Sequence, residues 1–449
     1  MIKLVFSDLR DHAATWIGAF LVAVACGCIG GWAASFQATA SAYAADPLVF
    51  RNLQQTVPVV ISFSSVAAVA VLASAANLTV SAQRRSYALW QLANVRPRLV
   101  STVVLAQMIA VAMLGAVCGT LLAVATVPLV FSLVITSQEG FSHVAPQVDA
   151  SLMPAVWFVV AGVFLLGGLK GARSAGRTPP LVALRDFEPK RKGMTWMRVF
   201  LFAGLAACTC WFIFFMIESG PSDAMNWSLF MPLFMVATLV PLAPLVFSAV
   251  LNAWTRLVPQ KRWNAWYLAR HTARFGLSAS TSVETPIMVG FGLVAGVFSA
   301  LGLFTSYLQS QGTIDINGLS FAAALLMLGG PVLLCADGAA VSVVMTSRSR
   351  TRDVALLIAS GARAETLMAA AVCEALIHAV TATLVGAVSV VASNAIVACV
   401  IGLPIFEGLA FGEGFVVSLV GFALVFAATF IPTCTALNQE TAAVLAMRE

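Results

Sequence analysis

The chain has 449 residues, of which 60% are hydrophobic and only 10% are charged, and its formal net charge is +6. About a quarter of the residues of a soluble protein are charged, so the composition excludes an ordinary soluble domain. The placement of the basic residues, described below, explains the positive charge, and we therefore expect no nucleic-acid partner.

Apolar runs recur along the chain and predict an all-α polytopic membrane protein. A run of about 20 residues is long enough to cross roughly 30 Å of hydrocarbon. Ten such spans are predicted, at about residues 13–35, 57–80, 101–135, 151–170, 197–217, 228–252, 285–309, 319–345, 365–400 and 411–435. The first is too long for a signal peptide, so we expect it to remain as an uncleaved span. The third and the ninth are too long for one straight span, so we expect each to begin as an interfacial helix or to break near its outer end.

The basic residues predict how these spans are oriented. If the N-terminus lies in the cytoplasm, 24 of the 25 Lys and Arg residues fall in cytoplasmic segments, and only Arg51 lies outside. This is the distribution that the positive-inside rule describes. Both termini are therefore expected in the cytoplasm. The external loops are expected to be short, the longest at about residues 36–56.

A tandem repeat is visible when the sequence is shifted by 267 residues. The matched positions lie mostly at polar, glycine or charged residues: Arg85 and Arg352, Asn94 and Gly361, Arg96 and Arg363, Gln107 and Glu374, Gly119 and Gly386. The shift covers six spans, an even number, so the two copies are parallel and not inverted. The predicted layout is 4+2+4: a four-span unit at 1–186, a linking pair at 187–262 and a second four-span unit at 263–449. Gly115 and Gly119 form a GxxxG pattern, which predicts close helix packing.

Each copy has the same cytoplasmic segment between its second and third spans. Apolar residues recur at helical spacing behind a basic start, and Asn94 or Gly361 follows, both residue types that tolerate the left-handed conformation ending a helix. Each segment therefore predicts a short amphipathic helix, a stop and a turn that carries Arg96 or Arg363. Such a helix could rest on anionic lipid headgroups. We favour a protein-docking surface, because lipid contact does not require both copies to keep the stop and the arginine.

Three ionisable side chains lie inside predicted spans: Asp337, Glu374 and His378. Charges in a bilayer are costly and are functional candidates. Glu374 and His378 are four residues apart, so they share a helix face and can pair. They could form a proton relay, contact a substrate, or make a structural pair near the cytoplasmic interface, whereas Asp337 has no obvious partner. The spacing is not that of a zinc motif, and no metal site is expected.

The second copy resembles the permeases of FtsX/MacB-type ABC transporters. The shared pattern is Arg352, Ala355-Leu356-Leu357, Gly361-Ala362, Glu374 and the terminal Met447-Arg448. The first copy departs from it, with Trp90, Asn94 and Gln107 in place of the family's Leu, Gly and Glu. The ten-span count is similar to that of the BceB-like branch. The short external loops differ from the large extracytoplasmic domains of both branches and leave the substrate open.

The resemblance implies a partner rather than an enzyme. No Walker A motif occurs in the chain, so we expect it to bind no cofactor, with ATP and Mg²⁺ bound by a separate ABC ATPase dimer. The residues implied in coupling to that dimer are Arg84, Arg85, Leu89, Asn94, Arg96, Arg352, Leu356, Gly361 and Arg363. The implied activity is export or extraction of an amphiphile, such as a peptide or a lipid-like molecule. The alternatives are a transmembrane signalling scaffold acting on an extracytoplasmic partner, and a proton-coupled secondary transporter.

Overall fold

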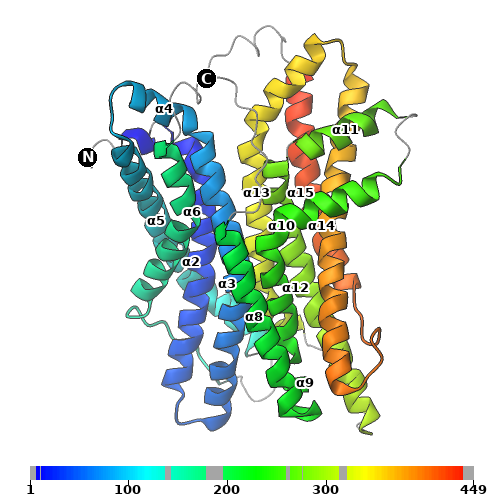
Figure 1. The fold of residues 1–449 in the computed structure, drawn as a ribbon. Helices are drawn as coiled ribbons and strands as arrows, with labels where there is room; N and C mark the ends of the chain where they lie inside the picture. The colour runs from blue at the N-terminus through cyan, green and yellow to red at the C-terminus, as the bar shows by residue number, and fades with distance from the viewer. Residues whose placement is uncertain are drawn as a thin grey trace. The chain divides into compact units, whose positions relative to one another are not determined.

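The computed structural model describes residues 7–10, 12–136, 143–177, 196–258, 263–275, 277–312 and 321–437. All regular secondary structure in these ranges is helical. The chain divides into two compact units (Figure 1). The first contains the helices up to α6 together with residues 319–341, and the second contains residues 189–318 and 342–449.

Within the described residues, eight helices are long and apolar enough to cross a membrane, so the chain is a multi-pass membrane protein. These stretches are Thr15–Ala42, Pro47–Ala76, Pro97–Leu133, Trp196–Ser219, Pro221–Thr255, Val283–Ser310, Ala364–Ile401 and Gly412–Leu437. Shorter apolar helices, Met153–Leu169 and Met327–Val341, lie where the fourth and eighth spans are predicted. The count of ten spans stays a prediction.

The first unit is built from α2 (Ala13–Ala42), α3 (Pro47–Ala82), α4 (Arg84–Leu92), α5 (Pro97–Val134), α6 (Met153–Arg177) and the first part of α13 (Phe321–Ala359). α2 packs against α3 and α5, and α6 also packs against α3 and α5, so the four helices form a bundle (Figure 1). An apolar cluster that includes Phe36, Leu53 and Phe131 joins one end of α2, α3 and α5. The external loop predicted at 36–56 is much shorter than expected, because both flanking helices continue and only residues 43–46 separate them.

Glycines allow α2 and α5 to approach closely, as the GxxxG pattern predicts. A Cβ atom at Gly119 would lie 2.2 Å from the backbone oxygen of Val24, and one at Gly115 would lie 2.6 Å from the Cβ of Ala23. Gly27 on the facing helix is equally restricted, since its Cβ would lie 2.6 Å from the oxygen of Ala116. The close-packing interpretation of this pattern is confirmed.

We expect Gly119→Leu to destabilise the first unit by about 1–3 kcal/mol or more, because the added side chain meets backbone that cannot rotate away. The measurement is the melting temperature of the purified protein in detergent. Gly162→Leu is the matched control, since nothing lies within 4 Å of a Cβ built at that residue of α6. Equal melting temperatures for the two variants would contradict the packing described here.

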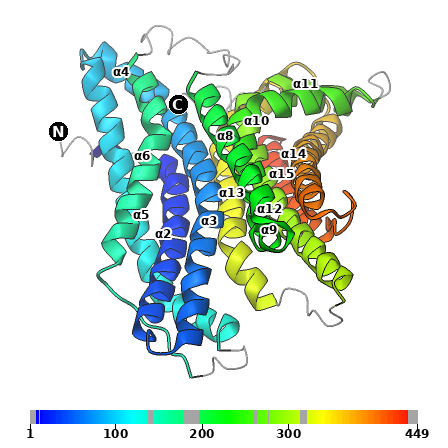
Figure 2. The same ribbon diagram turned by 60° about the horizontal axis from the view of Figure 1, so that its bottom comes forward.

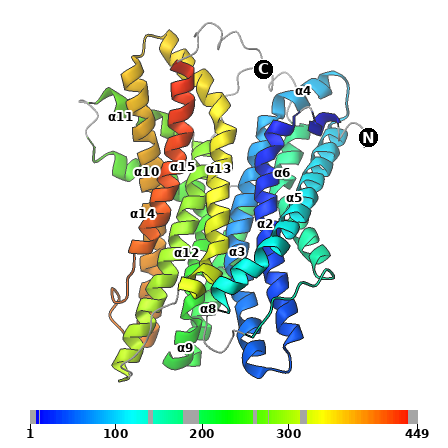
Figure 3. The same ribbon diagram turned by 180° about the vertical axis from the view of Figure 1, so that it is seen from behind.

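The second unit is arranged around α14 (Ala364–Ile401), which contacts α10, α11, α12 and α15. Its other helices are α8 (Trp196–Ser219), α9 (Pro221–Trp227), the 3₁₀ turn η1 (Ser228–Phe230), α10 (Met231–Thr255), α11 (Asn264–Phe275), α12 (Leu277–Ser310), α15 (Gly412–Leu437) and the rest of α13. Figure 3 shows α12, α14 and α15 running side by side. α11 differs, because it runs across α14 instead of along it (Figures 1 and 2).

The third and ninth predicted spans are each one continuous helix, so the expectation of a break is wrong, whereas the interfacial start stays a prediction. α5 and α14 both have 38 residues, and their first and last residues lie at the offset of 267 found in the sequence. A helix of this length extends about 57 Å, well beyond the hydrocarbon thickness. In the second unit, α11 packs against the first turns of α14.

Candidate functional site

Two helix-and-turn segments, the docking elements, lie at residues 83–98 and 350–365. In the first, α4 ends at Leu92 and α5 begins at Pro97; in the second, α13 ends at Ala359 and α14 begins at Ala364. The helix end and the next helix start of the second element each lie 267 residues after those of the first element. The two elements differ in how they begin. The short helix predicted in the first copy is confirmed as α4, but the separate helix predicted in the second is wrong, because α13 runs on without a break.

The stop in each docking element has the same backbone conformation. Asn94 has φ 67° and Gly361 has φ 92°, and Asn94 is the one residue other than glycine with positive φ in the described part of the chain. The backbone N–H of Val95 donates to the oxygen of Trp90, and that of Ala362 donates to the oxygen of Leu357, both at 3.0 Å. These bonds close a Schellman motif, which satisfies carbonyls left free at a helix end. The prediction that both residues end a helix is confirmed.

The two docking elements also bury and expose matched residues. Ala88 and Ala355 are fully buried against their own units. Leu89 and Leu356 are each 51% exposed. An exposed leucine carries apolar surface, and covering that surface is favourable wherever it would otherwise face water. Each element therefore presents an uncovered leucine at the same position, and the first element exposes Leu92 as well.

Basic residues flank these leucines. Arg96 and Arg363 are exposed and each immediately precedes the first residue of the next helix. Arg84, Arg85 and Arg352 lie on helices, but their side chains lie outside the described residues. Each element thus carries an exposed leucine and an exposed arginine at its turn. The turn leads directly into a 38-residue helix.

We expect Gly361→Val to loosen the second turn, because the left-handed conformation costs a β-branched residue about 1–2 kcal/mol. Nothing lies within 4 Å of a Cβ at Gly361, so the effect comes from backbone strain alone. Trypsin cleavage after the exposed Arg363 should become about 5–30 times faster. Gly361→Asn is the matched control, since Asn94 holds the same conformation in the first copy, and it should be cleaved at the wild-type rate. Equal cleavage of the two variants would show that the turn is not under this constraint.

A buried polar cluster in the second unit joins α12 to α14. The Nδ1 atom of His378 lies 2.7 Å from Oε1 of Glu284, and its Nε2 atom lies 3.8 Å from Oε1 of Glu374. Glu284 is fully buried, Glu374 is 7% exposed and His378 is 5% exposed. The predicted pairing of Glu374 with His378 is therefore present, and the imidazole lies between two carboxylates.

Glu284 was missed in the sequence because it lies one residue before the predicted span at 285–309. Its partner is 94 residues away, so no local spacing indicates the pair. The cluster lies in the part of α14 that α11 covers: Ala370, Cys373 and Ile377 pack against residues of α11. This position favours the structural interpretation of the pair. Within the ranges that the structure describes, no group of three His, Cys, Asp or Glu side chains is arranged to hold a metal ion.

The matched position in the first unit is also a buried polar contact. Gln107, which corresponds to Glu374, is fully buried and donates from Nε2 to Oδ2 of Asp8 at 2.7 Å. Nδ1 of His12 lies 3.1 Å from Oδ1 of the same carboxylate. Tyr87 of the first docking element is buried, and burial followed by the nearby charge of Asp8 raises the pKa of its hydroxyl above the usual value. In the first unit this position therefore bonds to an acidic side chain, whereas in the second unit His378, one turn after Glu374, makes the contact with the acidic Glu284.

Asp337 is separate from that cluster. It belongs to the first unit, on the part of α13 where Gly338 approaches the side chain of Val71 on α3. Its Oδ2 atom is buried and makes no hydrogen bond within the described residues. Glu374 and His378 belong to the second unit.

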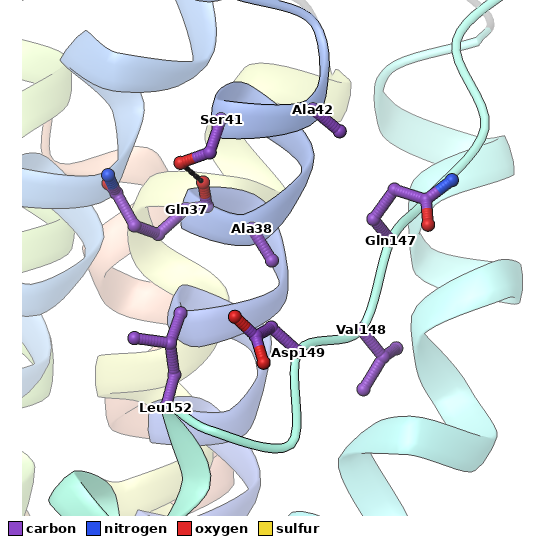
Figure 4. Close-up of a pocket in the computed structure, with 8 residues that line it drawn as sticks. All are labelled: Gln37, Ala38, Ser41, Ala42, Gln147, Val148, Asp149 and Leu152. Atoms are coloured by element: carbon purple, nitrogen blue, oxygen red, sulfur yellow. Dashed lines mark hydrogen bonds between the residues drawn. The ribbon is translucent and has the colours of Figure 1, made fainter.

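A shallow pocket of about 370 Å³ lies at the C-terminal end of α2 in the first unit (Figure 4). It is lined by Gln37, Ala38, Ser41, Ala42, Gln147, Val148, Asp149 and Leu152. The backbone N–H of Ser151 donates to the Asp149 carboxylate at 2.8 Å, and this bond lowers the pKa of Asp149 below its usual value. The loop is held to α2 by Thr39, whose hydroxyl bonds to both the N–H and the oxygen of Gln147. None of the residues selected from the sequence lines this pocket.

Comparison with known proteins adds no family to these observations, since no family model, curated protein or solved structure matches the chain. The resemblance to FtsX/MacB-type permeases therefore stays a prediction from the motif residues.

Proposed function

We propose that the chain is the permease subunit of an ABC transporter of the FtsX/MacB type in the cytoplasmic membrane of a bacterium. It spans the membrane ten times in a 4+2+4 arrangement, with both termini in the cytoplasm and with α6 and α13 adding two spans to the eight long apolar helices. Its two four-helix repeats, at 1–186 and 263–449, are joined by a linking pair at 187–262. The chain itself is not an enzyme, and a separate ATPase dimer binds ATP and Mg²⁺.

The observation that carries this proposal is the pair of matched docking elements. Two copies have the same helix end, the same left-handed stop, the same closing hydrogen bond and the same exposed leucine. Binding to a lipid surface does not require two matching docking elements, whereas a symmetric protein dimer presents two identical sites for them. Each docking element accordingly contacts one subunit of the ATPase dimer.

The geometry offers a direct route from such a contact to the other side of the membrane. Each turn leads, without an intervening loop, into α5 or α14, and each of these is one uninterrupted helix. A displacement of the turn is transmitted along the helix, because a hydrogen-bonded helix resists compression far more than a loop does. ATP-driven closure of the ATPase dimer thereby moves both helices and drives export or extraction of an amphiphilic peptide or lipid-like molecule. A signalling scaffold would use the same movement without a substrate.

We expect a tagged form of the chain, purified from its native membranes in mild detergent, to carry an ABC ATPase at two ATPase chains per permease chain. Native mass spectrometry measures this ratio, and ATP-dependent movement of a fluorescent amphiphile in vesicles distinguishes transport from signalling. Purification without any ATPase would contradict the proposal and would favour a secondary transporter.

A further inference from the structure

The first part of α13 carries a buried carboxyl oxygen without a partner. Asp337 lies in the apolar stretch Met327–Val341, and its Oδ2 atom is buried and makes no hydrogen bond within the described residues. Leu334 and Ala339, on the same stretch of helix, are almost completely buried. An ionised carboxylate in apolar surroundings is costly, and such a group takes up a proton unless a counter-ion is present. The neighbouring helices therefore decide the charge of this side chain.

The helices that pack against this part of α13 supply no counter-ion. α2 has no acidic or basic residue along its length, and the one charged residue of α3 is Arg51. Arg51 lies 20 residues before Val71, which contacts Gly338, and so it is about 30 Å away along α3. On α2, the thiol of Cys26 lies within electrostatic range of Asp337, but a thiol cannot neutralise a carboxylate. A proton is what remains to neutralise Asp337.

The carboxyl group lies where equivalent helices of the two repeats meet. The offset of 267 matches Val71 of α3 with Gly338 of α13, and a Cβ atom built at Gly338 would lie 2.6 Å from Cγ1 of Val71. Two turns earlier on α13, a Cβ atom built at Gly330 would lie 2.5 Å from Oγ of Ser64. α3 and α13 therefore approach closely over this length, and Asp337 is the residue next to the contact between matched positions.

We propose that Asp337 is a proton-binding site, and that the first part of α13 packs against α2 and α3 only while this carboxyl group holds a proton. Loss of the proton leaves a carboxylate among apolar side chains, so the segment then separates from α3 until water reaches the charge. The residue of α3 that matches Asp337 is Ala70, so one acid controls the contact between the two equivalent helices. The proposal rests on α13 crossing the membrane, as proposed above, and it does not depend on an ATPase partner.

The carboxyl group is accessible to an apolar reagent from one side. Asp337 is partly exposed, and Leu333, one turn earlier on the same helix face, is 51% exposed. Dicyclohexylcarbodiimide dissolves in membranes and reacts with protonated carboxyl groups. The O–H group adds across a C=N bond of the reagent, one nitrogen takes the proton, and the adduct rearranges to a stable N-acylurea. An aspartate in water holds a proton only near or below about pH 4, so labelling at neutral pH identifies a carboxyl group that keeps its proton.

The first test labels the full chain in membrane vesicles at about pH 7 and locates the adduct by peptide mass spectrometry. Asp337 should react up to about 1,000 times faster than an aspartate in water, which is the expected ratio of their protonated fractions. The exposed Asp223, in the first turn of α9, is the matched control and should stay unlabelled, and Asp337→Asn should remove the adduct. Equal labelling of Asp337 and Asp223 would overturn the proposal. Protection of Asp337 by added Na⁺ would overturn the proton in favour of a metal cation.

The second test compares the melting temperatures of the wild type and Asp337→Asn in detergent from about pH 5 to pH 8. Asparagine has the shape of the protonated acid and cannot lose a proton, so this variant should fold. The folded wild type binds one proton more than the unfolded chain, so each pH unit should lower its folding equilibrium constant, relative to the variant, by up to about tenfold. The wild type should therefore melt progressively below the variant as the pH rises. Parallel profiles would overturn the proposal, whatever the labelling shows.

Discussion

A chain that carries both Leu89→Glu and Leu356→Glu is expected to lose its ATPase partner completely, whereas each single substitution should leave one ATPase subunit bound. Each leucine is half exposed at the same position of its docking element, so a partner that covers it gains apolar contact. A carboxylate there replaces that gain with the cost of burying a charge. For a residue at the centre of an interface we expect a loss of about 2 kcal/mol or more, roughly 30-fold in affinity, at each element.

ATPase stimulation should be lost already in either single variant, because closure must act on both docking elements to move the two units. Co-purification and ATP hydrolysis in vesicles are measured together. Phe406→Glu is the control: this side chain is 73% exposed, but it lies in the loop between α14 and α15, at the opposite end of α14 from the docking turn. If the double variant binds and stimulates the ATPase as the wild type does, the docking assignment is wrong.

The second large effect is expected from His378→Leu. This substitution leaves the carboxylate of Glu284 fully buried without the 2.7 Å contact to Nδ1. Removing one member of a buried ion pair typically costs about 3–5 kcal/mol, because the other charge keeps its desolvation penalty. The melting temperature in detergent should fall markedly, and the yield of folded protein should fall with it.

The matched control is His143→Leu. His143 also pairs with a carboxylate, Asp46, at 3.4 Å, but its side chain is 55% exposed. An exposed pair contributes about 0–1 kcal/mol, so this variant should melt near the wild type. Adding Glu284→Leu to His378→Leu should restore part of the lost stability, since the fully buried carboxylate that lost its 2.7 Å contact is then removed. If His378→Leu and His143→Leu melt alike, the cluster does not tie α12 to α14.

Features that depend on residues close together in the sequence could be predicted, whereas contacts between residues far apart in the sequence could not. The helix stops at Asn94 and Gly361 depend on the conformational freedom of single residues, and they were found correctly. The close approach at Gly119 was indicated by a four-residue spacing. The contact of Glu284 with His378 joins residues 94 positions apart on different helices, and no pattern within either helix indicates it. The continuity of α14 was also missed, because a 38-residue apolar run does not show what will cover its ends.

The sequence by itself determined that this is a helical protein with many apolar segments, that its basic residues are concentrated between those segments, and that two distant segments share one pattern. These properties are local, since hydrophobic length, charge placement and backbone preference belong to short stretches of chain. Only the tertiary structure decided which side chains of those segments are uncovered, because exposure depends on which helices pack together. It left Leu89 and Leu356 equally exposed and buried His378 between two carboxylates. It also left the Nε atom of Arg270, the Nε1 atom of Trp266 and the Oδ2 atom of Asp337 without a hydrogen-bond partner within the described chain.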